Sequence, residues 1–319
     1  MLAAVDVRAW AGRALLGVVL AAVVAADPSP LRVVAGLFVL VVPFEKLFPR
    51  HRQPLRRAGL GTDLAYALAQ PVLAAGGLVA GVAVGLLSLA WVPGLVLRPV
   101  VAVLGPAPRM VLGFLLFDLA AYWAHRWSHE VPFLWRFHMV HHSSRHLDWI
   151  SGLRSHPFDG VLIGVPVAFL LGAGFTPQGA AAPAAVALVL GVFAHANVRW
   201  RWRPLQRVVQ TPEMHHWHHA DDPAAHNRNY AGFLPVWDLL FGTFYLPPDR
   251  RPAVYGVAEP LPAGMVGQLR HPLRSLPAPR WALVHPGRAL RRLAESLVRG
   301  ARQVGRATVR PTRAPGIAR

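Results

Sequence analysis

The residues of this chain most able to do chemistry are its histidines. Thirteen of the sixteen lie between His125 and His226, about a third of the 319 residues. Three short motifs stand out there, one HxxxH and two HxxHH, and chance seldom produces such a set in one chain. The motif histidines are His125 and His129, then His138, His141 and His142, then His215, His218 and His219.

The spacing of these histidines predicts a metal centre. Residues four apart on a helix lie on one face with Cβ atoms about 5–6 Å apart, close enough to hold one metal ion. This applies to His125 with His129, and to His138 with His142. Adjacent helical residues point about 100° apart, so a pair such as His141 and His142 can face two neighbouring metals. Eight imidazoles in three motifs therefore predict a dinuclear centre with few carboxylates.

Long uncharged runs predict the elements that position the motifs. No Asp, Glu, Lys or Arg occurs in the 34 residues between Asp63 and Arg98 or in the 39 between Asp159 and Arg199. A bilayer crossing takes about 20 apolar residues, so the second run predicts two helices joined by a turn at 172–179. The six predicted crossings are 10–26, 32–48, 63–90, 109–125, 159–175 and 179–196. His195, at the end of the last crossing, adds a ninth imidazole level with the motifs.

The composition also indicates a membrane protein. The chain is 54% apolar and only 15% charged, with a mean hydropathy of +0.36, whereas a soluble domain has about 25% charged residues. The absence of cysteine excludes a disulfide scaffold, a zinc ribbon and a thiol nucleophile. If the N-terminus is cytoplasmic, 29 of the 32 arginines fall on the cytoplasmic side. The net charge of +18 thus indicates orientation and not nucleic-acid binding.

The remaining histidines are interpreted one by one. A lone histidine is more often hydrogen-bonded than metal-bound. That is our interpretation of His51, His271 and His285, whereas His146, His216 and His226 stay open. His156, which lies in an Arg-Ser-His-Pro motif, is open between a metal ligand and a helix cap.

The absence of several common catalytic motifs limits the reactions that such a centre could carry out. Imidazole suits zinc, iron, copper and nickel, but the sequence has no HExxH, no nucleotide-binding loop and no GxSxG elbow. A two-metal, all-imidazole site at a membrane face favours oxidation of an unactivated C–H bond of a lipid. Two alternatives come from other classes: a His-rich membrane metal transporter or metal-binding protein, and a basic protein of the membrane surface. A transporter needs ligands within its crossings, and a surface protein leaves the paired HxxHH motifs unexplained.

The same motifs resemble those of a known family. The resemblance is to the fatty acid hydroxylase superfamily, which includes the sterol desaturases, and it covers residues 60–246. Its three histidine boxes are similar to 118–129, 134–144 and 211–219, with a short motif at 154–157 and closing segments at 229–230 and 237–244. As an ordered set, these matches are highly specific.

This resemblance implies a helical membrane enzyme with a cytoplasmic di-iron cap. Such an enzyme uses O2 and external electrons to hydroxylate or desaturate a lipid, which here would be sterol-like, fatty acyl, an ether lipid or a carotenoid. The electrons would come from a separate cytochrome- or ferredoxin-type protein, and zinc is a substitute metal on purification. The implied ligands are the eight motif histidines with His195 as a further one. Asp118 would orient ligands from behind, with Asn229 and Asp238 as weaker candidates for that task.

The predicted organisation has three parts. They are an N-terminal membrane hairpin at 1–59, a fatty acid hydroxylase-like catalytic domain at 60–246 and an Arg- and Pro-rich cytoplasmic tail at 247–319. Residues 1–26 are alternatively a cleaved signal peptide. The tail repeats apolar residues at helical spacing over 290–304, typical either of an amphipathic helix on an anionic leaflet or of a solvated tail. The predicted fold class is an all-α, polytopic membrane protein with about four to six transmembrane helices and a cytoplasmic His-rich helical cap.

Overall fold

The computed structural model describes residues 29–199 and 205–275 and is helical throughout that part of the chain. Two isolated β-bridges occur there, and no strands, which confirms the all-helical prediction for the described residues. The predicted crossing at 10–26 and the periodic stretch at 290–304 lie outside them. The elements are α2 (Ser29–Leu47), α3 (Leu60–Leu87), η1 (Val92–Leu97), α4 (Arg98–Val103), α5 (Pro106–Glu130), α6 (Pro132–His142), η2 (Ser151–Leu153), α7 (Pro157–Gly172), α8 (Pro177–Ala194), α9 (Pro212–His218), α10 (Val236–Leu240), α11 (Met265–Arg270) and η3 (His271–Ser275).

Five of the predicted crossings coincide with helices. These are α2, α3, α5, α7 and α8, each within a few residues of its predicted bounds. Two of them, α3 and α5, are long and apolar enough to cross a membrane, and α7 is a shorter apolar helix. These helices suggest association with a membrane, while the number of crossings stays a prediction.

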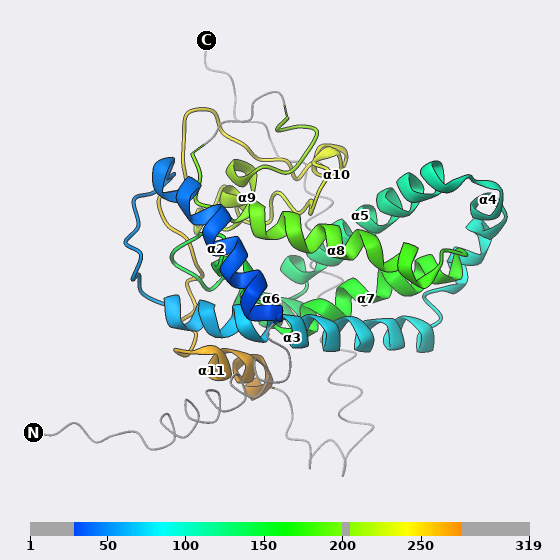
Figure 1. Ribbon diagram of the computed structural model, residues 1–319, viewed down its shortest axis with the longest axis horizontal. Coiled ribbons are helices and arrows are strands. Elements are labelled where there is room, and N and C mark those ends of the chain that lie inside the picture. Colours follow the sequence, from blue (N-terminus) through cyan, green and yellow to red (C-terminus); the bar gives the residue numbers. More distant parts are fainter. Residues whose placement is uncertain (1–28, 200–204, 276–319) are drawn as a thin grey trace, which may run out of the picture.

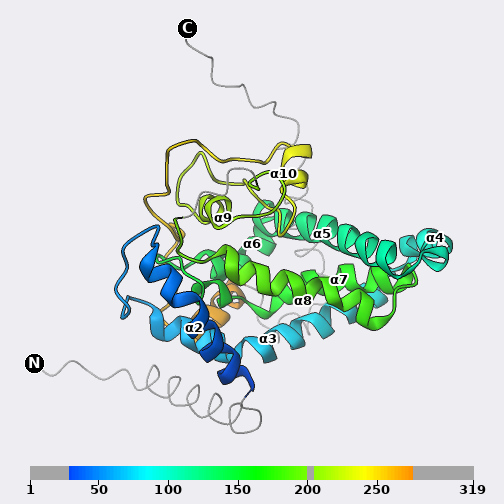
Figure 2. The same ribbon diagram turned by 45° about the horizontal axis from the view of Figure 1, so that its top comes forward.

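Four helices, α3, α5, α7 and α8, form a bundle with α4 at one end and α9 and α10 at the other (Figures 1 and 2). Gly113, near the start of α5, lies against Phe175, which follows α7, so these two helices run antiparallel. Phe117, Val167 and Leu170 form part of the buried core between them. As a result α5 and α8 end, and α7 begins, at the end of the bundle that carries α9.

Small residues allow α3 and α7 to approach closely. Gly77 and Gly81 of α3 face Gly160 and Gly164 of α7, and a Cβ on Gly81 would lie 2.2 Å from the carbonyl oxygen of Val161. Small residues spaced four apart let helix backbones meet in membrane proteins. Because 77 pairs with 160 and 81 with 164, the two helices run parallel, and the start of α7 is fixed beside α3.

A buried ion-pair network ties the start of α3 to the loop before α7. The Asp63 carboxylate accepts hydrogen bonds from Arg57 at 2.7 Å and from Arg154 Nε at 2.8 Å. Arg57 also binds both carboxylate oxygens of Asp148, at 2.6 and 2.7 Å. Removing one partner from a buried network leaves an uncompensated charge, so the loop that carries Arg154 is held in one position.

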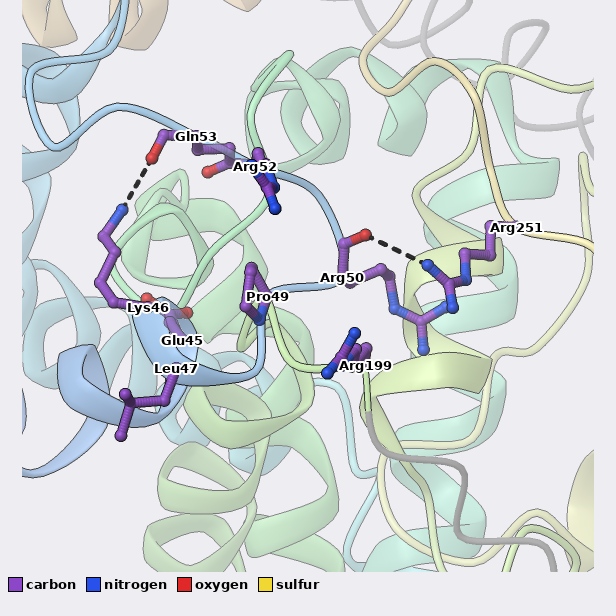
Figure 3. Close-up of a pocket in the computed structure, with 9 residues that line it drawn as sticks. All are labelled: Glu45, Lys46, Leu47, Pro49, Arg50, Arg52, Gln53, Arg199 and Arg251. Carbon is purple, nitrogen blue, oxygen red and sulfur yellow. Dashed lines mark hydrogen bonds between the residues drawn. The ribbon is translucent and has the colours of Figure 1, made fainter.

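The chain after α2 pairs with the chain after α8. Pro49 and Val198 form an isolated antiparallel bridge, and the Arg199 N–H donates to the Phe48 carbonyl at 2.9 Å. Figure 3 shows Pro49 and Arg199 of these two segments close together. The end of α2 is therefore joined directly to the segment that follows α8.

The described part of the predicted tail, 247–275, returns to the bundle. Met265 of α11 packs with Tyr66 of α3 and Val140 of α6 in a buried cluster. This segment thus covers the outer side of α6, the helix that carries the second histidine motif.

The glycine contact predicts a difference between two alanine variants of α3. Gly81→Ala would push a methyl group into the α7 backbone, and we expect it to lower the free energy of unfolding by about 1–3 kcal/mol. Gly76→Ala is the matched control, because nothing lies within 4 Å of its Cβ position and alanine favours the helix by up to about 1 kcal/mol. Thermal unfolding of both proteins in one detergent measures the difference, and equal midpoints would contradict the close packing.

Candidate metal centre

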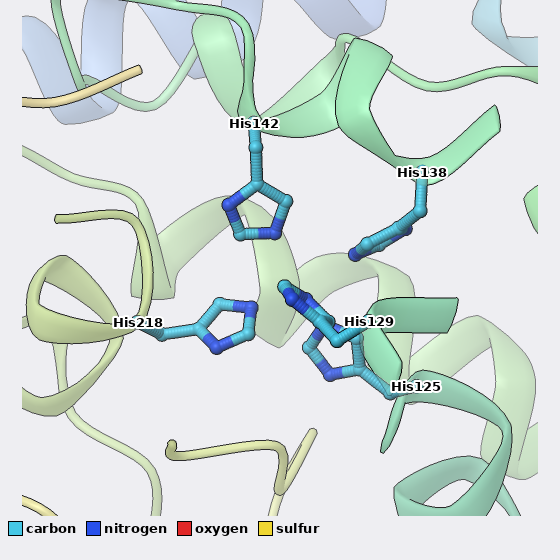
Figure 4. Close-up of side chains that lie close together, drawn as sticks. All are labelled: His125, His129, His138, His142 and His218. Atoms are coloured by element: carbon cyan, nitrogen blue, oxygen red, sulfur yellow. The ribbon is translucent and has the colours of Figure 1, made fainter. Parts of the chain in front are cut away.

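Nine of the predicted histidines converge at one end of the bundle, in two adjacent groups. Site A contains His125, His129, His138, His142 and His218, and site B contains His141, His195, His215 and His219. Within each group, one nitrogen of every ring lies within 4.8 Å of the others. Figure 4 shows the site A rings, from α5, α6 and α9, turned toward a shared space. The structure thus brings all nine together, and their binding of a metal stays a prediction.

Helix ends place these rings. One helix ends and another begins around Pro132, because proline suits the first turn of a helix and restrains the residue before it. His129 in the last turn of α5 therefore lies opposite α6. The third motif begins in the same way, with Pro212 after Thr211, whose side chain caps α9 by accepting a backbone N–H.

The HxxHH spacing divides its histidines between the two sites, as the helical geometry predicts. His141 belongs to site B and its neighbour His142 to site A, while His218 belongs to site A and His219 to site B. Adjacent residues of a helix point about 100° apart, so each motif serves both sites. The rings of His142 and His219 stack with centroids 4.1 Å apart, which makes the two sites direct neighbours.

In site A all five rings present the same atom to the shared space. Every Nε2 is buried and has no hydrogen-bond partner. On the other side of three rings, Nδ1 meets an acceptor: His125 the Tyr230 carbonyl at 2.7 Å, His138 Asp159 at 3.1 Å and His218 the Arg228 carbonyl at 2.8 Å. Such acceptors keep the hydrogen on Nδ1 and leave a bare lone pair on Nε2. Buried lone pairs that converge without donors are a site for a cation.

The distances between nitrogen atoms in site B also indicate a site for a cation. His195 Nε2 lies 3.2 Å from His141 Nε2 and 3.0 Å from the Nε2 atoms of His215 and His219. Yet Nδ1 of His141 lies 2.9 Å from the Arg154 carbonyl and Nδ1 of His195 lies 2.5 Å from a carbonyl of α8. A neutral imidazole carries one N–H hydrogen, which in both rings is on Nδ1 and is donated to the carbonyl. No hydrogen therefore lies between the Nε2 atoms of His141 and His195. A cation between them removes the repulsion of their lone pairs.

Burial keeps histidine rings of α6 and of the third motif neutral. Burial, together with the neighbouring imidazoles, holds the pKa of His142, His218 and His219 well below the usual range. Burial, with a smaller contribution from the neighbouring His138 ring, lowers the pKa of His141 to about 4. Neutral imidazole is the form that binds metals, so these rings are available as ligands at neutral pH.

Sequence reasoning missed the groups that hold the rings from behind. They are Asp159 on His138, the Gln210 amide nitrogen at 3.0 Å from His215 Nδ1, and the carbonyl oxygens of Tyr230, Arg154, Arg228 and Gly191. Asp159 lies two residues after the Arg-Ser-His-Pro motif, and an acid at that point was a usable signal. A carbonyl oxygen belongs to every residue and gives no such signal.

The predicted orienting residues act on a loop. Asp118 accepts from the Trp237 indole at 2.8 Å, and Asp238 accepts from the Tyr230 N–H at 2.8 Å. Asn229 donates to the carbonyls of Met214 and Tyr245. These bonds hold the backbone that presents the Tyr230 carbonyl to His125, so these side chains reach the ligands through the backbone.

The other histidines have separate surroundings. His156 caps α7: its ring accepts the Phe158 N–H at 3.1 Å, and Asp159 completes a capping box. His216 uses both ring nitrogens, with the Tyr255 hydroxyl at 2.7 Å and the Ala196 carbonyl at 3.1 Å. His51, His226 and His271 contact Tyr255, Asp221 and Glu259 respectively, and His285 lies outside the described residues.

A pocket of about 360 Å³ reaches site A. Its wall includes three site A histidines, His129, His142 and His218, and among the described lining residues there is none from site B. Apolar and polar groups share the rest of the wall, including Trp135, Met139, Asp221 and Glu259. A molecule in this pocket therefore meets site A first.

Substitutions of the two capping-box residues, Asp159 and His156, are expected to differ in their effects on metal binding and on helix stability. Asp159→Asn weakens the support of His138, and we expect it to lower metal affinity about 10–100-fold. His156→Ala removes the ring that caps α7, which costs about 1 kcal/mol of stability without touching a site A ring. Competition with a chelator measures affinity, and thermal unfolding measures stability. Equal metal loss in both variants would contradict the assigned role of Asp159.

Comparison with known proteins agrees with this geometry. Residues 110–243 match the fatty acid hydroxylase family. An ornithine lipid hydroxylase from Rhizobium tropici is 34% identical over 51% of this chain and 50% of its own length. An alkylglycerol monooxygenase from Danio rerio is 33% identical over 47% of this chain and 33% of its own. A sphingolipid C4-hydroxylase from Schizosaccharomyces pombe is 30% identical over 46% of this chain and 51% of its own.

The matched region carries all the histidines of both sites. No solved structure matches the chain, which spans about half the length, or less, of the relatives it matches. The match at 110–243 includes every histidine of sites A and B. Over this segment the predicted resemblance to the fatty acid hydroxylase superfamily is confirmed.

Proposed function

We propose that the protein is a membrane-bound di-iron oxygenase that hydroxylates a C–H bond of a lipid. The observation that carries this proposal is the convergence of nine imidazoles, on six buried and three half-buried residues, whose Nε2 atoms face one another in two adjacent groups. Such an arrangement does not suit a hydrogen-bonded core, because five of the rings direct Nδ1 at an oxygen acceptor and so turn a bare Nε2 toward their neighbours: His125, His138, His141, His195 and His218.

The residues present fit iron. Site A offers five imidazoles, one more than the four ligands that zinc usually takes in protein sites, and imidazole is a good ligand for iron. Site A would hold one ion through His125, His129, His138, His142 and His218, and site B the other through His141, His195, His215 and His219. When bound, the two ions supply activation of molecular oxygen for attack on a C–H bond. Zinc is a metal that these imidazoles would also accept on purification.

The chain itself positions the substrate and excludes water. The pocket at site A combines an apolar wall, with Trp135 and Met139, and polar groups such as Asp221 and Glu259, which suits a lipid with a polar part. Six of the nine histidines are buried, and so are the Nε2 atoms of all five site A rings, which keeps bulk water from the reacting atoms. Because the pocket meets only site A, we place the reacting carbon on that side.

The overall reaction needs a partner. One atom of O2 enters the C–H bond, and the other leaves as water with two electrons and two protons. We propose that a separate cytochrome- or ferredoxin-type protein supplies the electrons. We also propose a multi-pass protein whose histidine end faces the cytoplasm, as the positive-inside bias favours.

The relatives favour one reaction and one substrate class. Their names refer to hydroxylation or monooxygenation of ornithine lipid, alkylglycerol and sphingolipid, so a polar membrane lipid is the proposed substrate class and hydroxylation is preferred to desaturation. A metal transporter, the alternative from the sequence, is not supported, because the relatives are oxygen-inserting enzymes and the histidines gather at one end of the bundle.

The test combines metal content with lipid analysis. Anaerobically purified protein should hold two metal ions per chain, and cells that carry the gene should contain a lipid heavier by one oxygen atom, labelled when ¹⁸O2 is supplied. His138→Ala removes a site A ligand and should abolish turnover and lower the metal content. His156→Ala is the control, because His156 caps α7 and belongs to neither site. One metal or none in the wild type, or turnover in His138→Ala, would overturn the proposal.

A further inference from the structure

A second pocket, of about 500 Å³, lies where α2 ends. Five basic side chains and one acidic side chain line it: Lys46, Arg50, Arg52, Arg199, Arg251 and Glu45 (Figure 3). They come from three separate segments of the chain, which the bridge between Pro49 and Val198 helps to bring together. So many cations in one concavity create a strongly positive potential.

The acidic residue of this pocket is committed elsewhere. Glu45 is buried, and its Oε1 accepts the backbone N–H groups of Trp149 at 3.0 Å and Asn197 at 2.8 Å. Lys46 donates to a backbone carbonyl, that of Gln53, at 2.9 Å. Within the described residues, neither Arg199 nor Arg251 is in an ion pair. An anion held by Arg199 and Arg251 would therefore gain charge-assisted hydrogen bonds without displacing a carboxylate from either side chain.

Guanidinium groups point to a phosphate as the anion. A planar guanidinium matches the oxygen atoms of phosphate with two parallel donors. Figure 3 shows the side chains of Arg50, Arg199 and Arg251 directed to the same part of the pocket. The pocket volume of about 500 Å³ is that of a small-molecule site. A phosphate and its attached groups can occupy such a volume.

Exposed apolar residues beside the pocket indicate where the phosphate comes from. Leu47, which lines the pocket, is 68% exposed, Phe44 is 48% exposed and Phe48 is 37% exposed. Apolar side chains next to arginines at the end of an apolar helix are typical of a membrane interface, where anionic headgroups attract basic residues.

The same pocket is tied to the metal centre. The Arg50 N–H donates to the Asn197 carbonyl at 3.1 Å, and Asn197 Oδ1 accepts the His51 N–H at 3.0 Å. Asn197 is two residues after His195 of site B. An anion that joins Arg50 to Arg199 would thus brace the segment that presents His195.

We propose that this pocket binds the phosphate group of an anionic phospholipid, held by Arg50, Arg199 and Arg251. The site is separate from sites A and B, and its ligand is independent of the lipid that is oxidised. Since lipid binding is measured without metal or turnover, a failure of this proposal is distinct from a failure of the proposed function.

The test uses the full-length protein in phosphatidylcholine nanodiscs and fluorescent phosphatidylglycerol as the probe. The double variant R199E/R251E should bind the probe at least roughly tenfold more weakly, because two charge-assisted contacts become repulsive. Arg207→Glu is the matched control: Arg207 is an exposed arginine that does not line the pocket, and its reversal should change affinity by less than about twofold. Circular dichroism checks that all variants are folded.

A competition arm separates the two sources of phosphate. Inorganic phosphate and glycerol 3-phosphate are added to the wild type, and displacement of the probe would show that the phosphate group itself is recognised, in support of the proposal. Probe binding that survives both competitors but falls in R199E/R251E also supports it and assigns the site to the intact lipid. Equal probe binding by the wild type and the double variant would overturn it. Binding of inorganic phosphate without binding of the lipid would overturn the lipid assignment.

Discussion

The structure depends on one electrostatic requirement: buried imidazole nitrogens with bare lone pairs face one another at both sites. At site B, two such nitrogens lie 3.2 Å apart with no hydrogen between them. At site A, five lie together without any hydrogen-bond partner. Without positive charge between the rings this arrangement costs free energy, because buried acceptors have lost water and gained repulsion. Nine histidines at or near helix ends converge in spite of that cost, which is the physical reason for proposing two metal ions.

The rest of the fold serves to hold these rings in place. Parallel packing of α3 and α7 through Gly81 and Gly164 fixes the start of α7, and Asp159 in the first turn of α7 supports His138. The buried pair of Asp63 with Arg154 fixes the preceding loop, whose carbonyl oxygen holds a site B ring. The contact between α3 and α7 therefore supports site A through Asp159, and the ion pair supports site B through the carbonyl oxygen of Arg154.

The sequence predicted the helices and the grouping of histidines because both follow from local periodicity. Residues four apart share a helix face and adjacent residues do not, so the division of His141 and His142 between two sites needed no tertiary information. The groups behind the rings were not predictable in this way. The contact of the Tyr230 carbonyl with His125 joins segments 105 residues apart, and that of Gln210 with His215 depends on the conformation of the loop before α9. His156 shows the same limit, because a histidine in a motif serves equally well as a ligand or a cap until α7 is placed.

One segment borders both pockets and fixes their relative position. Residues 251–259 contribute Arg251 to the basic pocket and Glu259 to the pocket at site A. Between them the buried Tyr255 hydroxyl lies 2.9 Å from His51 Nε2 and 2.7 Å from His216 Nδ1. His216 lies within the third histidine motif, so this hydroxyl links the segment that carries Arg251 to the helix that carries histidines of both sites. The hydrogen bonds of the buried Tyr255 thus help to set the separation of the two pockets.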